Sequence, residues 1–371
     1  MNLNLNQTKL NFSDKNQIWL AALGLSIFIF LALVTINALS VPIYEWDAIS
    51  IWGYKAKILF NSSLNPKPKF FHDLSLIYSH LDYPLLVPLL LSGFYASLGG
   101  IDDQAVKVIF VLFYLAFWFI SYIGFRWKLS RNQSFCLATI IVGVPSVIRW
   151  AGTATADVPL AVYYSGSLLY LLKWIEKKNF RDWTLLVLFT AFCAFTKNEG
   201  IALALINILV MALFCNYNKR QNLFWVIAFG LSLLLLLAPY LIWNFDTPRV
   251  HENYISQIHT EIIFDGFNRL KLLVPRLASE ILNLSWWGTL WIAGLSLAGI
   301  GWKAFQKNYV RAAWTLFILH ITLYIFIYII TPWKISELLT YTLDRLILHT
   351  VPAMGYIIAF HWAEINGPTN S

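Results

Sequence analysis

Two carboxylates stand close together in the sequence, directly after the first long apolar segment. Glu45 and Asp47 are separated by one residue, and two lysines, Lys55 and Lys57, follow at helical spacing. A carboxylate at a membrane surface can take a proton from an attacking hydroxyl, or it can ligate a divalent cation such as Mg²⁺ or Mn²⁺ beside a phosphate leaving group. The alternative is structural, because acids also solvate helix ends and the nearby tryptophans also suit an interfacial belt.

Further charged residues stand at the ends of apolar segments, where they could line a shared polar site. The candidates for substrate binding are Lys55, His80, Asp82, Arg149, Asp157, Lys197, Glu199 and Arg345. Several have a structural alternative, because an acid such as Asp157 at a helix N-terminus is stabilised by the helix dipole by about 0.3–1 kcal/mol. Lys197, with Gly200 just beyond it, also fits an ordinary helix C-terminus. Both interpretations stay open at the level of single residues.

The composition predicts that a membrane-embedded helical bundle holds these residues. Of 371 residues, 58% are hydrophobic and only 12% are charged, whereas charged residues make up about 25% of an ordinary soluble domain. The mean hydropathy is +0.62. The apolar runs approach the roughly 20 residues that a helix needs to cross a hydrocarbon core. We therefore expect an all-α polytopic membrane protein that forms one domain over residues 1–371.

Ten apolar segments are expected to cross the membrane. They are residues 18–39, 105–125, 134–149, 157–174, 183–197, 201–217, 222–243, 285–302, 312–331 and 344–362. The apolar segment 83–98 is shorter and contains Pro84, Pro88 and Gly93, so we expect it to lie along the membrane surface. Amphipathic surface helices are expected in the loop that contains this segment.

The distribution of basic residues predicts the orientation. With segment 83–98 on the surface, fourteen Lys and Arg fall on the side of the N-terminus, and only four Asp and Glu share that side. Because positively charged loops tend to stay in the cytoplasm, both termini are expected there. The other face then carries two long loops, about 40–104 and 244–284, together with all of the candidate site residues.

Other functional classes fit the sequence less well. The net charge of +8 is spread over short loops rather than gathered in a basic block, so no nucleic-acid partner is expected. The three cysteines are far apart and have neither metal-binding nor disulfide spacing. A transporter typically shows related halves, and none are visible. A membrane transporter and a non-catalytic assembly subunit remain the alternatives to an enzyme.

Several motifs, in a fixed order, resemble those of the GT-C glycosyltransferases. The acidic pair after the first span resembles the E-x-D-type pair of the branch that contains protein O-mannosyltransferases and aminoarabinose transferases. Three further segments are similar to that branch's His-Pro-Pro-Leu, Ala-x-x-Asp-x-x-Leu and Thr-Lys-x-Glu-Gly motifs, namely His80-Leu-Asp-Tyr-Pro-Leu-Leu-Val-Pro-Leu89, Ala156-Asp-Val-Pro-Leu160 and Thr196-Lys-Asn-Glu-Gly200. Asp344-Arg345 resembles an Asp-Arg pair near the last spans. The resemblance covers about residues 40–200, and it departs from the family where Asp-Tyr-Pro replaces the paired prolines.

The resemblance implies a mannosyltransferase-like enzyme that takes its sugar from a polyprenyl-phosphate donor, either undecaprenyl or dolichyl. The acceptor would be a hydroxyl of a cell-envelope glycan, a lipid or a protein, at the non-cytoplasmic face of a plasma or bacterial inner membrane. On this hypothesis Asp47, beside Glu45, is the general base of a single inverting displacement. Arg149, Lys197 and Arg345 would hold the leaving phosphate. The sequence indicates no cofactor, and a divalent cation, Mg²⁺ or Mn²⁺, stays open.

The second long loop is expected to choose the acceptor. Its charged residues include Arg249, His251, Glu252, His259, Glu261, Asp265, Arg269, Lys271 and Arg276. Apolar residues recur between them at helical spacing, which predicts one or two amphipathic surface helices over residues 244–284. Such helices would roof the cavity beside the first loop, although a solvated cover without selectivity fits the pattern as well.

Overall fold

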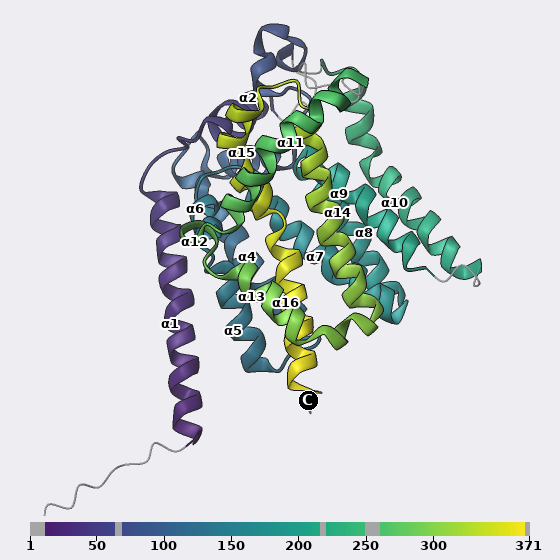
Figure 1. Ribbon diagram of the computed structural model, residues 1–371. Coiled ribbons are helices and arrows are strands. Elements are labelled where there is room, and N and C mark those ends of the chain that lie inside the picture. Colours follow the sequence, from purple (N-terminus) through teal and green to yellow (C-terminus); the bar gives the residue numbers. More distant parts are fainter. Residues whose placement is uncertain (1–11, 64–68, 216–219, 249–259, 368–371) are drawn as a thin grey trace, which may run out of the picture.

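The computed structural model describes residues 12–63, 69–215, 220–248 and 260–367. Within these ranges the chain consists of helices and connecting turns and contains no strand (Figure 1). The all-α prediction is thereby confirmed. Long helices lie side by side in the body of the molecule, whereas α2, α11 and α15 lie at its upper end in Figure 1. The two ends of the molecule are therefore built differently.

Seven predicted spans correspond to single long helices. These are α1 (Phe12–Leu39), α4 (Val108–Phe125), α7 (Asp157–Lys177), α8 (Phe180–Thr196), α9 (Asn198–Leu213), α10 (Arg220–Phe245) and α14 (Asn308–Ile330). By length and composition, four described segments could each cross a membrane alone, namely Gln17–Leu39, Ala105–Phe125, Leu223–Phe245 and Asn308–Ile330. Two bent helix pairs raise that number to six. Ten crossings therefore stay a prediction.

The other three predicted spans are each divided into two helices. Residues 134–149 form α5 (Arg131–Val142) and α6 (Pro145–Ala151), which are bent by 65°. Residues 344–362 fall in α15 (Ile335–Leu348) and α16 (Val351–Asn366), bent by 40°. Residues 285–302 fall in α12 (Leu284–Trp287), α13 (Leu290–Ile300) and a 3₁₀ turn, η5 (Trp302–Gln306).

The breaks have local causes. Pro145 and Pro352 lie in the first turns of α6 and α16, where the missing N–H of proline costs nothing, although it would break a helix interior. Gly288 separates α12 from α13 at a φ of 54°, a conformation that favours glycine. The break after α15 lies close to Asp344 and Arg345, and the short helix that begins at Pro145, α6, carries Arg149 in its last turn.

Helix α7 forms the centre of the bundle. Its side chains are buried along most of its length, and it packs against α4, α8, α14 and α16. A helix that is apolar on all sides is stable when other helices surround it. Asp157, in the first turn of α7, is therefore held at one end of the protein core.

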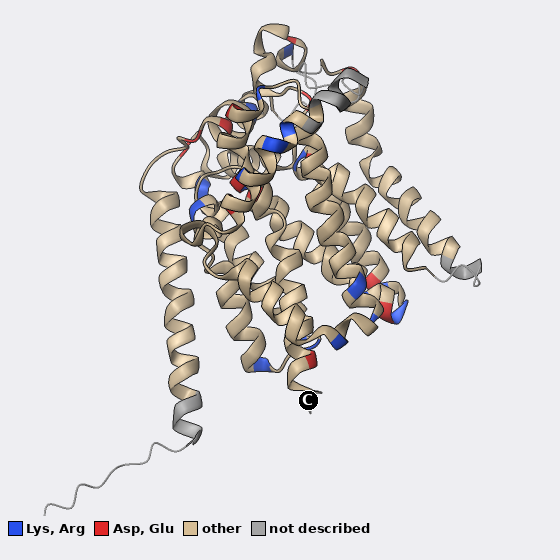
Figure 2. Cartoon of the chain, viewed as in Figure 1, with Lys and Arg blue, Asp and Glu red and all other residues tan. Residues whose placement is uncertain are grey.

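Charged residues gather at the two ends of the bundle, and a nearly charge-free zone separates them (Figure 2). A charged side chain at the centre of a bilayer costs about 2.5–3.5 kcal/mol on insertion scales. The distribution is that of an integral membrane protein whose middle lies in lipid. Which end faces the cytoplasm stays a prediction.

Both long loops contain helices. The first contains a π-helix, η1 (Ala48–Gly53), then α2 (Tyr54–Asn61), η2 (Lys69–His72), η3 (Leu74–Ser79), α3 (Leu86–Leu98) and η4 (Ala105–Lys107). The second contains α11 (Thr260–Ile281), whose polar and apolar residues segregate on opposite faces. The predicted amphipathic helix of the second loop is thereby confirmed. Arg249, His251, Glu252 and His259 lie outside the described residues, as do the side chains of Glu261 and Asp265.

Candidate active site

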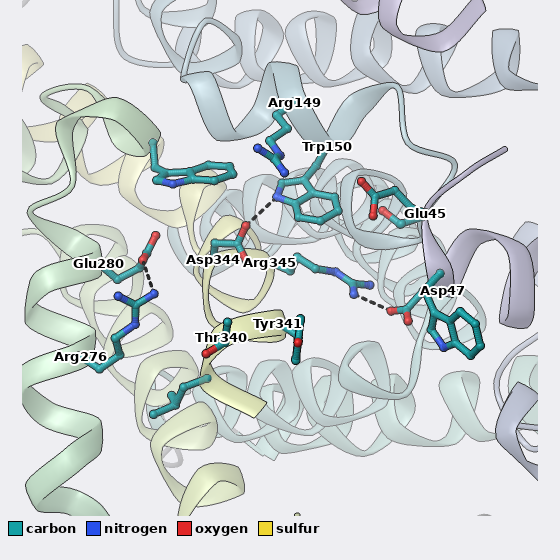
Figure 3. A pocket seen from close by; sticks show the side chains of 14 residues that line it. Glu45, Asp47, Arg149, Trp150, Arg276, Glu280, Thr340, Tyr341, Asp344 and Arg345 are labelled. Atoms are coloured by element: carbon teal, nitrogen blue, oxygen red, sulfur yellow. Dashed lines mark hydrogen bonds and ion pairs between the residues drawn. The ribbon is translucent and has the colours of Figure 1, made fainter. Parts of the chain in front are cut away.

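A cavity of about 520 Å³ opens where the broken helices meet the two loops (Figure 3). It is lined by Glu45, Trp46, Asp47, Arg149, Trp150, Thr155, Arg276, Glu280, Trp286, Leu339, Thr340, Tyr341, Asp344 and Arg345. Seven of these residues carry a charge, and three are tryptophans. Such a lining suits a ligand with both polar and apolar surfaces, since ring faces pack on apolar surface while charged groups bind polar atoms.

Four elements deliver the charged groups to the cavity. Glu45 and Asp47 lie in the turn between α1 and η1. Arg149 is in the last turn of α6, immediately before the chain breaks towards α7. Arg276 and Glu280 are one helical turn apart on α11, and Asp344 with Arg345 lies in the last turns of α15. The predicted gathering of Glu45, Asp47, Arg149 and Arg345 at one site is present in the structure.

Arg345 connects the cavity to the protein core. Its Nη1 donates to Asp47 Oδ2 at 2.5 Å, and its Nε donates to Asp157 Oδ2 at 2.8 Å. The guanidinium also lies over the ring of Trp150, 5.3 Å from the centroid. One buried cation thus holds a cavity carboxylate on one side and a core carboxylate on the other. Charge-assisted hydrogen bonds of this kind are roughly twice as strong as neutral ones.

Asp157 lies behind the cavity and is fully buried. Besides Arg345, its carboxylate accepts hydrogen bonds from Lys197 Nζ at 3.0 Å and, on the same oxygen, from His349 Nε2 at 3.1 Å. Lys197 also pairs with Glu199 Oε1 at 2.7 Å. Asp157, Lys197 and Glu199 therefore support Arg345 from behind and do not line the cavity, and direct substrate binding by them stays a prediction.

Arg149 differs from Arg345 in its surroundings. Its side chain is exposed, and its guanidinium lies over Trp286 at 4.6 Å and over Trp150 at 5.8 Å. It makes no ion pair within the described part of the chain. Figure 3 shows it at the top of the cavity, beside Trp150. A cation held by aromatic faces and by no carboxylate is available to an anionic ligand.

The side of the cavity opposite Asp47 carries a second polar group of residues. Glu280 is buried, accepts a hydrogen bond from Trp287 Nε1 at 3.2 Å and lies 3.7 Å from Arg276 Nη2. Burial raises the pKa of the Glu280 carboxyl. Asp344 accepts a hydrogen bond from Trp150 Nε1 at 3.0 Å. Figure 3 places Glu280 and Arg276 across the cavity from Glu45 and Asp47.

Lys55, His80 and Asp82 form a separate cluster in the first loop. The Lys55 side chain is fully buried, donates to the backbone oxygen of His80 and lies over the Tyr83 ring at 5.7 Å. The backbone oxygen of Asp82 accepts a hydrogen bond from Tyr240 Oη at 3.0 Å. Burial lowers the pKa of Lys55 to about 7 and that of His80 to about 4. None of the three residues lines the cavity, so their predicted role in substrate binding stays a prediction.

Comparison with known proteins agrees with this architecture. Residues 82–243 match the family model of dolichyl-phosphate-mannose-protein mannosyltransferase. The structure of ArnT from Cupriavidus metallidurans bound to undecaprenyl phosphate aligns with a TM-score of 0.59 and 15% identity, covering 92% of this chain and 60% of that one. ArnT from the same organism in the apo state aligns with a TM-score of 0.56 and 14% identity, covering 93% and 59%. This chain has the fold of these two ArnT structures.

The predicted resemblance to GT-C glycosyltransferases is thereby confirmed. The chain spans about three fifths of the length of the two ArnT chains. A search of curated proteins finds no match to the sequence. The family-model segment, residues 82–243, runs from α3 into α10, so it includes Arg149, Asp157 and Lys197.

A divalent cation would need a suitable set of ligands. Within the described residues, no group of three or more His, Cys, Asp or Glu side chains is placed to hold a metal ion. Glu45 and Asp47 both line the cavity, and Asp47 is already bound to Arg345. Mg²⁺ usually binds proteins through one or two carboxylates together with substrate phosphates. Whether a divalent cation, Mg²⁺ or Mn²⁺, takes part therefore stays open, as the sequence left it.

Sequence reasoning missed several residues of this site. Trp150 and Trp286 frame the cation of Arg149, and Glu280 closes the far wall. The Arg-Trp pair at 149–150 and the Trp-Trp pair after α11 were available as signals, because tryptophan is enriched at interfaces and binds a nearby arginine through its ring face. His349 gave no signal, since a lone histidine near a helix end has no distinctive spacing.

Proposed function

We propose that this protein is a membrane glycosyltransferase that moves a sugar from a polyprenyl-phosphate donor to an acceptor hydroxyl. One observation carries the proposal: Asp47, fixed by Arg345, shares one cavity with Arg149, a cation that no described carboxylate neutralises. A base and an anion-binding cation in one cavity are the two groups that transfer from a phosphate leaving group requires. The ArnT-like fold and the mannosyltransferase family match support the same donor class.

The reaction is a single inverting displacement at the anomeric carbon. Asp47 accepts the proton of the acceptor hydroxyl while the hydroxyl oxygen forms a bond to the anomeric carbon. The bond between that carbon and the phosphate oxygen breaks, and its electron pair stays on the phosphate. The products are the glycosylated acceptor, polyprenyl phosphate and a proton on Asp47. Glu45, on the same wall, keeps a second carboxylate beside the acceptor.

Arg149 is the residue best placed to bind the leaving phosphate. Arg345 and Lys197 are already paired with carboxylates, so their charge is largely compensated. Arg149 is exposed to the cavity, and its guanidinium can form two parallel hydrogen bonds to phosphate oxygens. Arg345 instead orients the Asp47 carboxylate. Helix α11, which presents Arg276 and Glu280 to the cavity, contacts the acceptor and takes part in choosing it.

The site acts at the non-cytoplasmic face of the membrane. The excess of Lys and Arg in the loops at the opposite end supports a cytoplasmic position for that end and for both termini. The donor lipid then reaches the cavity from the outer leaflet, and the acceptor approaches from outside the cell.

The test is sugar transfer by purified protein in lipid nanodiscs. Radiolabelled polyprenyl-phosphate mannose and further polyprenyl-phosphate sugars are supplied with delipidated envelope extract as the source of acceptor. We expect the wild type to move label from the lipid to an extract component, and Asp47→Asn to lower kcat by about 10²–10⁴-fold, the range for a lost general base. Asp103→Asn, a first-loop acid that pairs with Lys57 outside the cavity, is the control. Full activity of Asp47→Asn would remove the base assignment, and no transfer from any donor would overturn the function.

A further inference from the structure

A row of hydrogen bonds behind the cavity is not used by the proposed mechanism. His349 lies at the C-terminal end of α15, just before the chain bends into α16, and it is fully buried. Its Nε2 lies 3.1 Å from Asp157 Oδ1, and its Nδ1 lies 2.8 Å from the hydroxyl oxygen of Tyr324 on α14. Tyr324, His349 and Asp157 thus connect α14, the α15–α16 bend and α7 in one line.

The partners of His349 define its tautomer. Asp157 already accepts hydrogen bonds from Lys197 and Arg345, and an ionised carboxylate can only accept. The Nε2 atom of His349 must therefore carry the proton and donate to Asp157. The Nδ1 atom is then an acceptor, and the Tyr324 hydroxyl donates to it. Which ring nitrogen holds the proton is set by the hydrogen bond that the other one makes.

The neighbouring polar groups leave this arrangement intact. The groups that face His349 are Asp157 on α7, Lys197 and Glu199 at the start of α9, and His320 with Tyr324 on α14. The His320 ring packs against Tyr324 at 4.6 Å between centroids, but neither of its nitrogens has a hydrogen-bond partner in the described part of the protein. His320 therefore does not compete for the Tyr324 hydroxyl.

We propose that His349, locked by Tyr324, is a positioning residue that sets the orientation of the general base Asp47 through Asp157 and Arg345. The two carboxylates bind different nitrogens of one guanidinium, Asp157 at Nε and Asp47 at Nη1. A rotation of the Asp157 carboxylate would shift the Arg345 guanidinium and, with it, the Asp47 carboxylate. The hydrogen bond from His349 to the other oxygen of Asp157 opposes that rotation. The inference rests on the proposed function, in which Asp47 is the base.

A purely structural role would look different. Buried polar groups need partners, and a Tyr–His–Asp row could serve only to satisfy them. Removing the Tyr324 hydroxyl would then lower stability and leave the surviving folded enzyme with its normal kcat and with the same His349 tautomer. A positioning role predicts that the folded variant itself has altered kinetics, because His349 can take its other tautomer and stop donating to Asp157.

Four variants separate the two roles. Tyr324→Phe removes one hydroxyl and keeps the ring, and Tyr328→Phe is its matched control one turn along α14, where the hydroxyl bonds Thr342 Oγ1 at 2.8 Å, away from Asp157. His349→Gln keeps an N–H near the position of Nε2, whereas His349→Leu keeps a similar side-chain volume without any polar group. Each is purified, and its folded fraction is quantified before kinetic measurement.

We expect Tyr324→Phe to lower kcat about tenfold, the equivalent of one ordinary hydrogen bond of about 1.4 kcal/mol. The KM for the donor should change by less than about twofold, because Arg149 is untouched. His349→Gln should retain more activity than His349→Leu, and Tyr328→Phe should match the wild type. Unchanged kcat in both Tyr324→Phe and His349→Leu would overturn the proposal.

A second measurement is independent of sugar transfer. Nitrogen NMR of protein labelled at the histidine rings reports the tautomer directly, and the signal of His349 is assigned by its loss in His349→Gln. We expect the Nε2–H tautomer in the wild type and in Tyr328→Phe, and a mixture of tautomers in Tyr324→Phe. The same single tautomer in all three proteins would contradict the claim that Tyr324 fixes the tautomer of His349. Inactive wild-type protein would count against the proposed function. The ring-nitrogen signals would still show whether Tyr324 fixes the tautomer of His349.

Discussion

Arg149 and Arg345 line the same cavity, but their surroundings give them different chemistry. Arg345 is buried and bound by two carboxylates, whereas Arg149 is exposed and bound by two indole rings. The sequence assigned both to the leaving phosphate, because residue type and position at a helix end are all that a pattern shows. The ion pairs of Arg345 join residues that are 188 and 298 positions apart, so no local pattern could have predicted them.

The free charge of Arg149 leads to a prediction for donor binding. Arg149→Gln should raise the KM for the polyprenyl-phosphate donor about ten- to a hundredfold, since a hydrogen bond to a charged group contributes about 1.5–3 kcal/mol. Arg149→Lys should recover part of the affinity, because an ammonium binds phosphate as a point charge only. Lys334→Gln, which removes an exposed cation paired with Glu337, serves as control. Equal donor KM in Arg149→Gln and wild type would assign the phosphate to another group.

The buried Lys55 leads to a prediction for stability. Burial lowers its pKa to about 7 in the folded protein, from 10.5, so between these pH values the unfolded chain binds more protons than the folded one. Stability should therefore rise with pH across this window, by up to about 1.4 kcal/mol per unit. Lys55→Met should lack this rise, and should melt above the wild type near pH 7 and approach it near pH 10. Parallel melting curves for both proteins across the window would contradict a neutralised Lys55.

At the scale of elements, the sequence predicts the helices, but only the fold shows which residues the helix breaks bring to the cavity. Pro145 and Pro352 mark the starts of new helices, as proline chemistry predicts. That the bends place Arg149 and Arg345 on one cavity depends on the packing of α6 and α15 beside α7. The motif over residues 196–200 is likewise a tight turn between α8 and α9 that carries Lys197 and Glu199.

Gly200 makes that turn possible, which leads to a prediction for α9. A Cβ at Gly200 would lie 1.9 Å from the backbone oxygen of Cys193, so an added methyl group meets backbone that cannot move aside. Gly200→Ala should destabilise the protein by more than the about 1–3 kcal/mol typical of overpacking and should displace Lys197 from Asp157. Gly230→Ala is the control, because a Cβ there meets nothing within 4 Å and alanine favours the helix. Thermal melting in detergent measures both, and an equally stable Gly200→Ala would contradict the tight turn.

For the whole molecule, composition and hydropathy were sufficient to predict a helical membrane protein, and the ordered motifs were sufficient for the GT-C resemblance. The sequence did not predict which charged residues line the cavity and which lie behind it. Asp157, Lys197 and Glu199 were expected beside Asp47 at the substrate, and they lie behind it in the core. A membrane topology places residues on one face, but it does not say which of them reach the cavity and which are covered by a neighbouring helix.

The remaining prediction concerns how the whole molecule lies in the membrane. In a variant with Cys136, Cys193 and Cys215 replaced by serine, single cysteines are introduced at the exposed positions Asp73→Cys, in the first loop, and Lys177→Cys, at the end of α7. A membrane-impermeant maleimide applied to intact spheroplasts should label Asp73→Cys directly and Lys177→Cys only after permeabilisation, because basic loops stay in the cytoplasm. The reversed pattern would put the cavity on the cytoplasmic side, where a donor in the outer leaflet could not reach it. Labelling of both sites in intact spheroplasts would mean that the 83–98 segment crosses the membrane, and the basic loops after α1 would then face outward against the charge rule.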